Sequence, residues 1–164
     1  ALGLTKSSHI HWSYGERISA AAAGDAAYGV TATVDFTENN PDWKLSNEFA
    51  KRYHQRFGDW PGWPASSTYQ GTRVFLRAIE KAGSLDSAKV MRSLQNFEDP
   101  NPITGRPFII RGCDQKSIQP LYTVMWTQSD EYKPGYWKIM KKYADPEHSL
   151  LPCELKANYD KMKY

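Results

Sequence analysis

Two short stretches of the sequence combine aromatic rings with hydroxyl groups. Trp12-Ser13-Tyr14 follows a predicted strand over residues 8–12, and open α/β sheets bind their ligands at the carboxyl ends of strands. The second stretch precedes and opens a predicted helix, and its members are Trp60, Trp63, Ser66 and Tyr69. A stacked ring with one or two hydroxyls suits a flat or cyclic ligand. Core packing explains Trp12 equally well, and loop packing explains Trp60 better.

Patterns for catalysis or metal binding are weak by comparison. His9-x-His11 places two imidazoles on one face of a strand, but a zinc site needs further ligands and none lies nearby in the sequence. The motifs G-x-S-x-G, H-E-x-x-H, G-x-G-x-x-G and the P-loop are all missing. The sequence does not pair any carboxylates into an acid–base couple, and those considered are Glu16, Asp25 and Asp35. We therefore expect no enzyme activity, no metal and no cofactor.

The composition is that of an ordinary globular chain. Of its 164 residues, 40% are hydrophobic and 24% are charged, and no segment is long enough to span a membrane. The net charge of +3 is small, and Lys/Arg residues cluster only at 138–142 and in the tail, which argues against a nucleic-acid binder. The aromatic share of 13% favours a binding cleft or a large interface, although packing alone also accounts for it.

Residues 66–97 are predicted to form two helices joined by a glycine turn. A stripe of helical period runs along the first helix through Thr72, Phe75, Leu76, Ile79 and Ala82. Gly83 follows where a left-handed residue ends a helix. Ser84 or Asp86 then caps the second helix, which turns three apolar side chains inward, namely Val90, Met91 and Leu94. The pair must bury its stripe against something else in the domain.

The remaining elements alternate between helices and strands. We expect a helix over 18–27, a buried strand over 29–36, and a helix that Asn40 caps, with Pro41 at its first position and Gly58 at its end. After a break at 99–102, two strands of one hairpin are predicted over 106–113 and 119–128, with Tyr122, Val124 and Trp126 on one face. A short strand over 136–141 and a polar tail along the surface complete the chain.

Several short motifs occur in a fixed order between residues 69 and 115. They are Tyr69-x-Gly71, Ala78-Ile79-x-x-Ala82-Gly83-Ser84, Val90-x-x-x-Leu94, Thr104-Gly105 and a hairpin tip at Asp114-Gln115. In this order and spacing they resemble the C-terminal half of the periplasmic branched-chain amino-acid-binding family, the type I solute-binding proteins of ABC importers. The resemblance covers residues 10–128. It points to a family whose members differ in ligand.

The resemblance implies an α/β chain that supplies the C-terminal portion of a two-lobed, type I periplasmic-binding-protein fold. Residues 1–33 and 104–164 would belong to lobe two, the latter as a hairpin and tail, and the helices of residues 34–103 to lobe one. It implies a periplasmic protein that delivers a small solute to the permease of an ABC importer and binds no nucleic acid. Ala1–Leu4 are interpreted as the end of a helix that begins earlier, so the remaining N-terminal part of the same protein is an expected partner.

Two cysteines, Cys113 and Cys153, allow one pairing. In a cytosolic protein they would be two unrelated buried thiols, whereas in an exported protein a disulfide is expected. Because the resembled family is exported, we expect the bond, with the two Cα atoms within about 7 Å of each other.

The resemblance also implies where the ligand binds. In the family, the loop at Trp12 lines the cleft from lobe two, and one residue there holds the ammonium group of the ligand. That position falls on Trp12, where amino-acid binders carry a carboxylate, so an aromatic or other unsaturated acid is expected rather than leucine or valine; other organic acids and amides remain open. The expected ligand-binding residues are Trp12, Ser13, Tyr14, Trp63, Ser66 and Tyr69. A ligand-sensing regulatory module on the same fold is the alternative.

Overall fold

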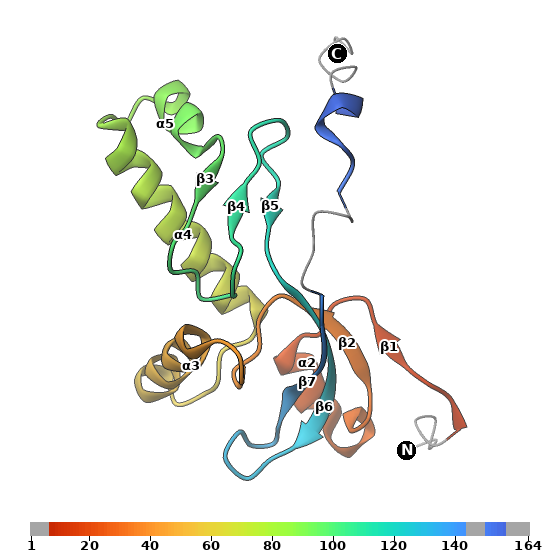
Figure 1. Ribbon diagram of the computed structural model, residues 1–164. Coiled ribbons are helices and arrows are strands. Elements are labelled where there is room, and N and C mark those ends of the chain that lie inside the picture. The colour runs from red at the N-terminus through yellow and green to blue at the C-terminus, as the bar shows by residue number, and fades with distance from the viewer. Residues whose placement is uncertain (1–6, 144–149, 157–164) are drawn as a thin grey trace.

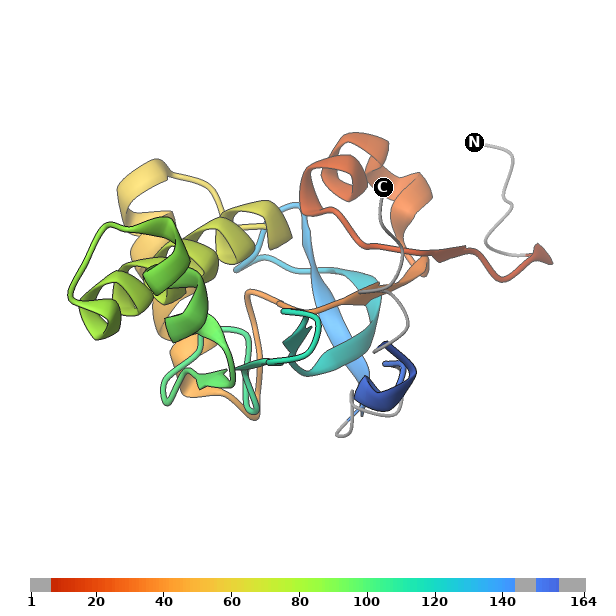
Figure 2. The ribbon, with the colours of Figure 1, turned by 90° about the horizontal axis from the view of Figure 1, so that it is seen from above.

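The computed structural model describes residues 7–143 and 150–156, so the helix end expected at residues 1–4 lies outside the described residues. The described chain divides into two regions (Figure 1). The sheet region consists of a four-stranded sheet with helix α2 (Arg17–Ala23). The helical region consists of a three-stranded sheet with helices α3 (Lys44–Phe57), α4 (Trp63–Ala82) and α5 (Ser87–Leu94). Seen from above, the helices and the four-stranded sheet lie side by side (Figure 2).

The four-stranded sheet has the order β1-β2-β6-β7, and its strands are His11–Trp12, Thr31–Val34, Leu121–Gln128 and Gly135–Tyr143. β1 runs parallel to β2, and the other neighbours are antiparallel. The strands predicted over 8–12 and 29–36 are therefore confirmed, each in a shorter form. The predicted last strand is also confirmed and extends further than expected.

The core of the sheet region lies on one face of β6. Tyr122, Val124 and Trp126 alternate onto this face and are almost completely buried, as the period of two predicts. Trp137 of β7 packs edge-to-face against Trp126, with ring centroids 5.1 Å apart. The face is covered by α2 and by the 3-10 turn η1 (Gly24–Ala27), which packs Ala27 into the same core. The helix predicted over 18–27 thus ends its α-helical part at Ala23.

The predicted pairing of residues 106–113 with 119–128 is wrong. Instead, β4 (Ile109–Ile110) pairs with β5 (Ser117–Ile118), and β3 (Phe97–Glu98) completes a three-stranded sheet of order β3-β4-β5. β6 pairs with β2 on one side and β7 on the other. The backbone groups of a buried strand need hydrogen-bond partners along the whole length of the strand. The nine residues of β7 supply partners for the eight residues of β6, whereas the two residues of β4 are too few.

Helix α3 (Lys44–Phe57) begins later than the sequence predicts. Trp43 is its N-cap residue, so the expected cap at Asn40 is wrong. Asn40 instead uses its side-chain oxygen to accept the backbone N–H of Asp42, and its amide donates to the Tyr122 hydroxyl at 3.2 Å. These bonds make a turn before the helix and tie it to the sheet. Gly58 ends the helix in the left-handed conformation, as predicted, with φ of 77°.

Helices α4 (Trp63–Ala82) and α5 (Ser87–Leu94) form the predicted pair. Gly83 ends α4 with φ of 58°, and the carboxylate of Asp86 accepts the Lys89 backbone N–H at 3.0 Å to cap α5. Both local predictions are confirmed. None of the helices in the described part of the chain is long and apolar enough to cross a membrane.

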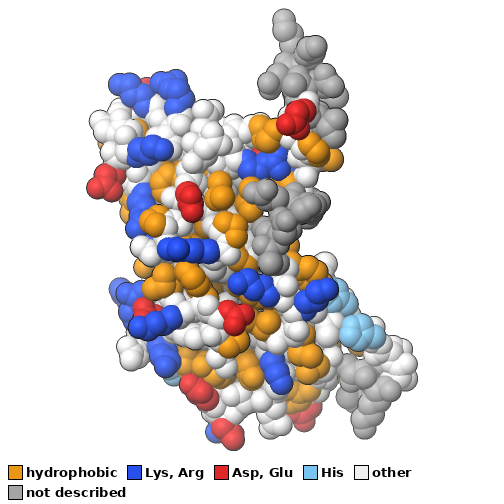
Figure 3. Space-filling view, in the orientation of Figure 1, with side chains coloured by type: hydrophobic (Ala, Val, Ile, Leu, Met, Phe, Trp, Pro, Cys, Tyr) orange, Lys and Arg blue, Asp and Glu red, His pale blue; other side chains and the backbone are white. Residues whose placement is uncertain are grey.

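The buried face of α4 differs from the prediction. The buried residues are Ser66, Gln70, Val74 and Ala78, whereas Phe75 and Leu76 are 52% and 58% exposed. Gln70 accounts for the difference, because its amide donates to Asp99 at 2.6 Å and accepts the backbone N–H of Ile103 at 2.9 Å. These buried hydrogen bonds fix the rotation of α4 about its own axis. Hydrophobic side chains consequently reach the surface of the helical region, among basic ones (Figure 3).

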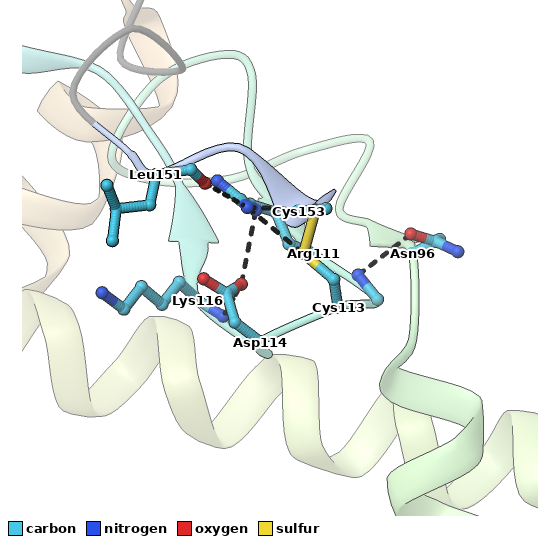
Figure 4. Close-up of a disulfide and its surroundings, with 8 residues drawn as sticks. Asn96, Arg111, Cys113, Asp114, Lys116, Leu151 and Cys153 are labelled. Carbon is cyan, nitrogen blue, oxygen red and sulfur yellow. Dashed lines mark hydrogen bonds and ion pairs between the residues drawn. A yellow bond between two sulfur atoms is a disulfide. The ribbon is translucent and has the colours of Figure 1, made fainter. Parts of the chain in front are cut away.

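The expected disulfide joins Cys113, in the turn between β4 and β5, to Cys153 (Figure 4). The two Cα atoms lie 5.8 Å apart. Cys153 begins the 3-10 turn η3 (Cys153–Lys156), so the bond attaches this part of the tail to the hairpin. The rest of the tail, which we expected along the surface, falls at residues 144–149 and 157–164, outside the described residues.

Candidate ligand site

Tyr14 and Trp63 bring the two aromatic stretches into contact. Their ring centroids lie 4.7 Å apart with an interplanar angle of 72°, an edge-to-face pair. Tyr14 lies in the loop after β1, and Trp63 is the first residue of α4. Gly15 lets the loop approach β2, because a Cβ atom there would lie 2.7 Å from the Cβ of Ala32. The pair marks the place where the sheet region meets the helical region.

A buried carboxylate lies beside this aromatic pair. Asp35 follows β2, and its Oδ2 accepts hydrogen bonds from the Gln119 amide at 2.9 Å and from the Ser67 hydroxyl at 3.5 Å. Its Oδ1 is buried without a hydrogen bond to any described residue. Asp35 therefore joins the end of β2, the first turns of α4 and the segment before β6. We call Asp35, Ser67 and Gln119 the Asp35 cluster.

The environment of the cluster changes the acidity of two groups. Burial raises the pKa of Asp35, and the polar groups of Tyr14, Gln119 and Ser67 oppose that rise. Burial also raises the pKa of Tyr14, and the negative charge of Asp35 raises it further. Tyr14 therefore stays a neutral phenol at ordinary pH. Together these residues offer a ligand a ring surface, a hydroxyl and an acceptor oxygen, and none of them carries a positive charge.

The structure does not bring the other predicted ligand residues to the same place. Trp12 is half-buried and packs edge-to-face on Trp137, with ring centroids 6.0 Å apart, and Ser13 is exposed. Ser66 is buried, and its hydroxyl donates to the backbone carbonyl of Trp63 at 2.9 Å. Tyr69 packs against Phe49 of α3, with centroids 4.8 Å apart. Their roles in binding stay predictions.

Sequence reasoning missed the Asp35 cluster. Asp35 and Gln119 lie 84 residues apart in the chain, and no local pattern connects them. One signal was present, because Asp35 is a carboxylate at the end of a run of β-branched and apolar residues. A buried carboxylate needs hydrogen-bond partners, so its position predicts that polar groups from elsewhere gather around it.

Arg17 anchors the start of α2, directly after the loop of Tyr14. Its guanidinium donates to Glu38 Oε1 at 2.7 Å and to three backbone carbonyls. Two of them, those of Tyr132 and Lys133, lie in the β6–β7 turn, and the third is that of Gly135 at the start of β7. Burial raises the pKa of Glu38 to about 7, although the charge of Arg17 lowers it. These bonds fix the first turn of α2, which follows the loop directly. They therefore limit how far Tyr14 can move.

Two hollows flank α4. One, of about 510 Å³, lies between α4 and the β4–β5 hairpin and includes Ser67 and Gln119 of the Asp35 cluster in its lining. The other, of about 810 Å³, lies between α3 and α4, where Tyr69 forms part of its wall. Both volumes fall in the range of small-molecule sites. The first is continuous with the candidate site, and the second includes Tyr69 without the other predicted residues.

The two histidines of β1 and its approach bind threonines of β2. His9 Nε2 lies 3.0 Å from Thr31 Oγ1, and His11 Nδ1 lies 2.9 Å from the same oxygen. Within residues 7–143 and 150–156, no group of three or more His, Cys, Asp or Glu side chains is arranged to hold a metal ion. Hydrogen bonds to β2 thus account for both imidazoles.

Comparison with known proteins points in one direction. Residues 1–131 match a family described as periplasmic binding protein. No curated protein matches the sequence. Among solved structures, the chain is similar to a solute-binding protein of an ABC transporter from Rhodopseudomonas palustris BisB5, solved in complex with 3,4-dihydroxybenzoic acid. That match has a TM-score of 0.75 and 24% identity, and covers 89% of this chain and 41% of that chain.

Two further structures show the same likeness. A periplasmic binding protein from Burkholderia mallei matches with a TM-score of 0.75 and 22% identity, over 91% of this chain and 39% of that one. A leucine-, isoleucine-, valine-, threonine- and alanine-binding protein from Brucella ovis, in a closed conformation, matches with a TM-score of 0.71 and 17% identity, over 92% and 40% of the two chains. At these identities the likeness concerns the fold. This chain spans about two fifths of the length of these proteins.

Proposed function

This chain belongs to the periplasmic binding protein family, and we propose that it is the carboxy-terminal portion of a substrate-binding protein that delivers a small solute to an ABC importer. Its fold is part of the two-lobed type I architecture. The proposal places the protein in the periplasm, with the importer permease and the N-terminal part of the same protein as partners. Such a protein binds and releases its solute without chemical change.

The contact between Tyr14 and Trp63 carries the proposal. We assign residues 1–33 and 104–164 to lobe two and residues 34–103 to lobe one, so the two rings would come from different lobes and meet where the lobes join. The division is supported by the four-stranded sheet, whose strands come almost wholly from the first and third segments, and by α3 to α5, which come from the second. The β4–β5 hairpin departs from this division, because it forms a sheet with β3 of the second segment and lies with the helical region (Figure 1).

The proposed ligand is a small aromatic or other unsaturated acid. Tyr14 and Trp63 supply ring contacts, and the exposed Ser13 and the Asp35 cluster supply hydrogen bonds. Because the cluster presents acceptor oxygens and no positive charge, a hydroxyl or other donor group of the ligand would meet it. The carboxylate of the ligand would then be held from the N-terminal part of lobe one. For Trp12, Ser66 and Tyr69 the observed packing favours support of the two aromatic stretches.

Delivery depends on closure of the two lobes around the ligand. A ligand that contacts both lobes favours the closed form, and it shifts the equilibrium only by its difference in affinity for the two forms. Asp35 lies at the proposed crossing between lobes and binds groups from both, which suits a hinge position. No observation on the described residues favours the regulatory alternative.

Mass spectrometry of the solute released from the native full-length protein tests the ligand class. Calorimetric titration then compares phenyl-bearing acids with leucine. We expect Tyr14→Ala and Trp63→Ala each to weaken binding of the aromatic acid by about 2–4 kcal/mol, because both rings would be central contacts. Tyr143→Ala is the matched control, since this tyrosine of β7 is similarly exposed and lies outside the candidate site.

Two outcomes separate the possibilities. Tighter binding of leucine, with Tyr14→Ala and Trp63→Ala unaffected, contradicts the proposed ligand class. Trp12→Ala decides the role of that residue. If Trp12 contacts the ligand, the variant binds the ligand more weakly and is as stable as the wild type. If Trp12 only packs against Trp137, the variant is less stable.

A further inference from the structure

Arg111 lies against both sulfur atoms of the disulfide. Its Nη2 is 3.2 Å from Cys113 Sγ and 3.0 Å from Cys153 Sγ (Figure 4). The same nitrogen donates to the carbonyl of Leu151 at 2.8 Å, while Nε lies 3.3 Å from the Asp114 carboxylate. The guanidinium is therefore fixed from two sides, and its Nη2 points at the sulfurs.

A fixed positive charge at a disulfide favours its reduced form. Reduction releases a thiolate, and an adjacent arginine lowers the pKa of a thiol and stabilises the thiolate. A thiol of lower pKa is also a better leaving group in thiol–disulfide exchange. Asp114 shares the guanidinium but binds through Nε, so Nη2 is shared by the two sulfurs and the carbonyl of Leu151. The positive charge beside this disulfide therefore makes the bond easier to reduce.

The bond is also accessible. Both cysteines are exposed, and a hollow of about 600 Å³ between the tail and the hairpin includes Arg111, Ile118 and Cys153 in its lining. A thiolate can reach Cys153 without unfolding of either sheet. Exposed disulfides beside a positive charge are the labile ones, whereas structural ones resist reduction.

We propose that the Cys113–Cys153 bond is a site of thiol–disulfide exchange with a dithiol reductant of the Cys-x-x-Cys kind. The reductant's thiolate attacks one sulfur, forms a mixed disulfide and expels the other sulfur as a thiolate that Arg111 stabilises. The second thiol of the reductant then closes its own disulfide and releases the second cysteine. Two electrons pass from the dithiol to the protein, and the two protons of the dithiol balance the two thiols formed. Exchange would leave residues 150–156 attached to the hairpin through non-covalent contacts alone.

The test measures the redox equilibrium of the full-length protein in dithiothreitol buffers of graded potential, with mass-tag alkylation of free thiols as the readout. We expect Arg111→Gln to lower the equilibrium constant for reduction about tenfold, which corresponds to about 30 mV for a two-electron couple. Lys116→Gln is the matched control, because it removes one positive charge from the same hairpin and its side chain points away from the sulfurs (Figure 4). We expect its change to stay within about twofold of the wild type, since exposed charges are screened by salt.

An Arg111→Gln midpoint equal to that of the wild type or of Lys116→Gln overturns the proposal. So does a wild-type bond that a thioredoxin-type dithiol reduces only in denaturant. If Arg111→Gln does not fold, the alkylation rate of the reduced wild type is measured as a function of pH, and this rate gives the apparent pKa of its thiols. An apparent thiol pKa below the ordinary value of about 8.5 supports the proposal, and one at or above that value overturns it. None of these readouts depends on the ligand.

Discussion

The sheet region and the helical region both bury an apolar core, but the helical region also exposes several large apolar side chains on α3 and α4. In the sheet region, Tyr122, Val124, Trp126 and Trp137 are each at most 2% exposed, and α2 closes the core over them. In the helical region, Phe57, Phe75 and Leu76 are each more than half exposed. Phe49 of α3 and Val74 of α4 are buried at the same time, so each of these helices has one covered face and one exposed apolar face.

The comparison indicates that α3 and α4 carry apolar surface that no described residue covers. Exposed apolar surface of this kind is typical of sites that bind another polypeptide. The chain spans about two fifths of the similar structures, and we propose that the N-terminal part of lobe one covers this surface. Three predictions test this contrast, from the largest expected effect to the smallest.

Trp126→Ala in β6 should lower the free energy of unfolding of the isolated chain by about 3–5 kcal/mol, because it empties a site packed by Trp137. Phe75→Ala removes a ring of similar chemistry from α4. In the isolated chain, where Phe75 is 52% exposed, we expect a change within about 0.5 kcal/mol. Urea denaturation of both variants measures the difference, and equal effects in the isolated chain would remove the contrast between the two regions.

Glu38 should make stability depend on pH at the junction of the two regions. Its pKa in the folded protein is about 7, above the ordinary value of 4.5. Between these two values the folded state binds more protons than the unfolded state, so the free energy of unfolding falls as the pH rises. The slope from this one group is at most about 1.4 kcal/mol per pH unit.

Denaturation at pH 5, 6, 7 and 8 measures this slope. We expect Glu38→Gln to remove it and to keep the hydrogen-bonding geometry around Arg17. Glu48→Gln is the control, since Glu48 is exposed and paired with Lys44 on the surface of α3. A Glu38→Gln protein with the same pH dependence as the wild type would show that the carboxyl does not titrate in this window.

The double substitution of Phe75 and Leu76 by serine should have the smallest effect on stability and a large effect on association. Because both side chains are exposed in this chain, we expect the isolated chain to unfold within about 0.5 kcal/mol of the wild type. Its tendency to self-associate should fall, as measured by sedimentation velocity. Val74→Ser, at a buried neighbour, should destabilise without reducing association.

The opposite result is informative as well. An isolated wild-type chain that stays monomeric, melts in one cooperative transition and binds the solute would contradict the idea that the helical region needs a cover.

The sequence by itself determined the local features of this protein. Glycine is the residue that takes positive φ without a steric penalty, so Gly58 and Gly83 mark helix ends wherever the rest of the fold lies. The carboxylate of Asp86 caps α5 within three residues, and the alternation of Tyr122, Val124 and Trp126 sets the buried face of β6. The family was also evident from the order of short motifs, and the disulfide followed from the exported nature of that family.

The tertiary structure decided everything that depends on residues far apart in the chain. A helical stripe identifies an apolar face, but the hydrogen bonds of Gln70 to Asp99 and Ile103 decide which face of α4 turns inward. The alternating pattern of a strand does not specify which strand it pairs with. The pairing of β6 with β7 follows from the length of β7, which only the structure shows. The Asp35 cluster and the contact of Tyr14 with Trp63 exist because loops from two regions meet at the end of β2. Contacts of this kind depend on the relative placement of whole elements, which no local propensity encodes.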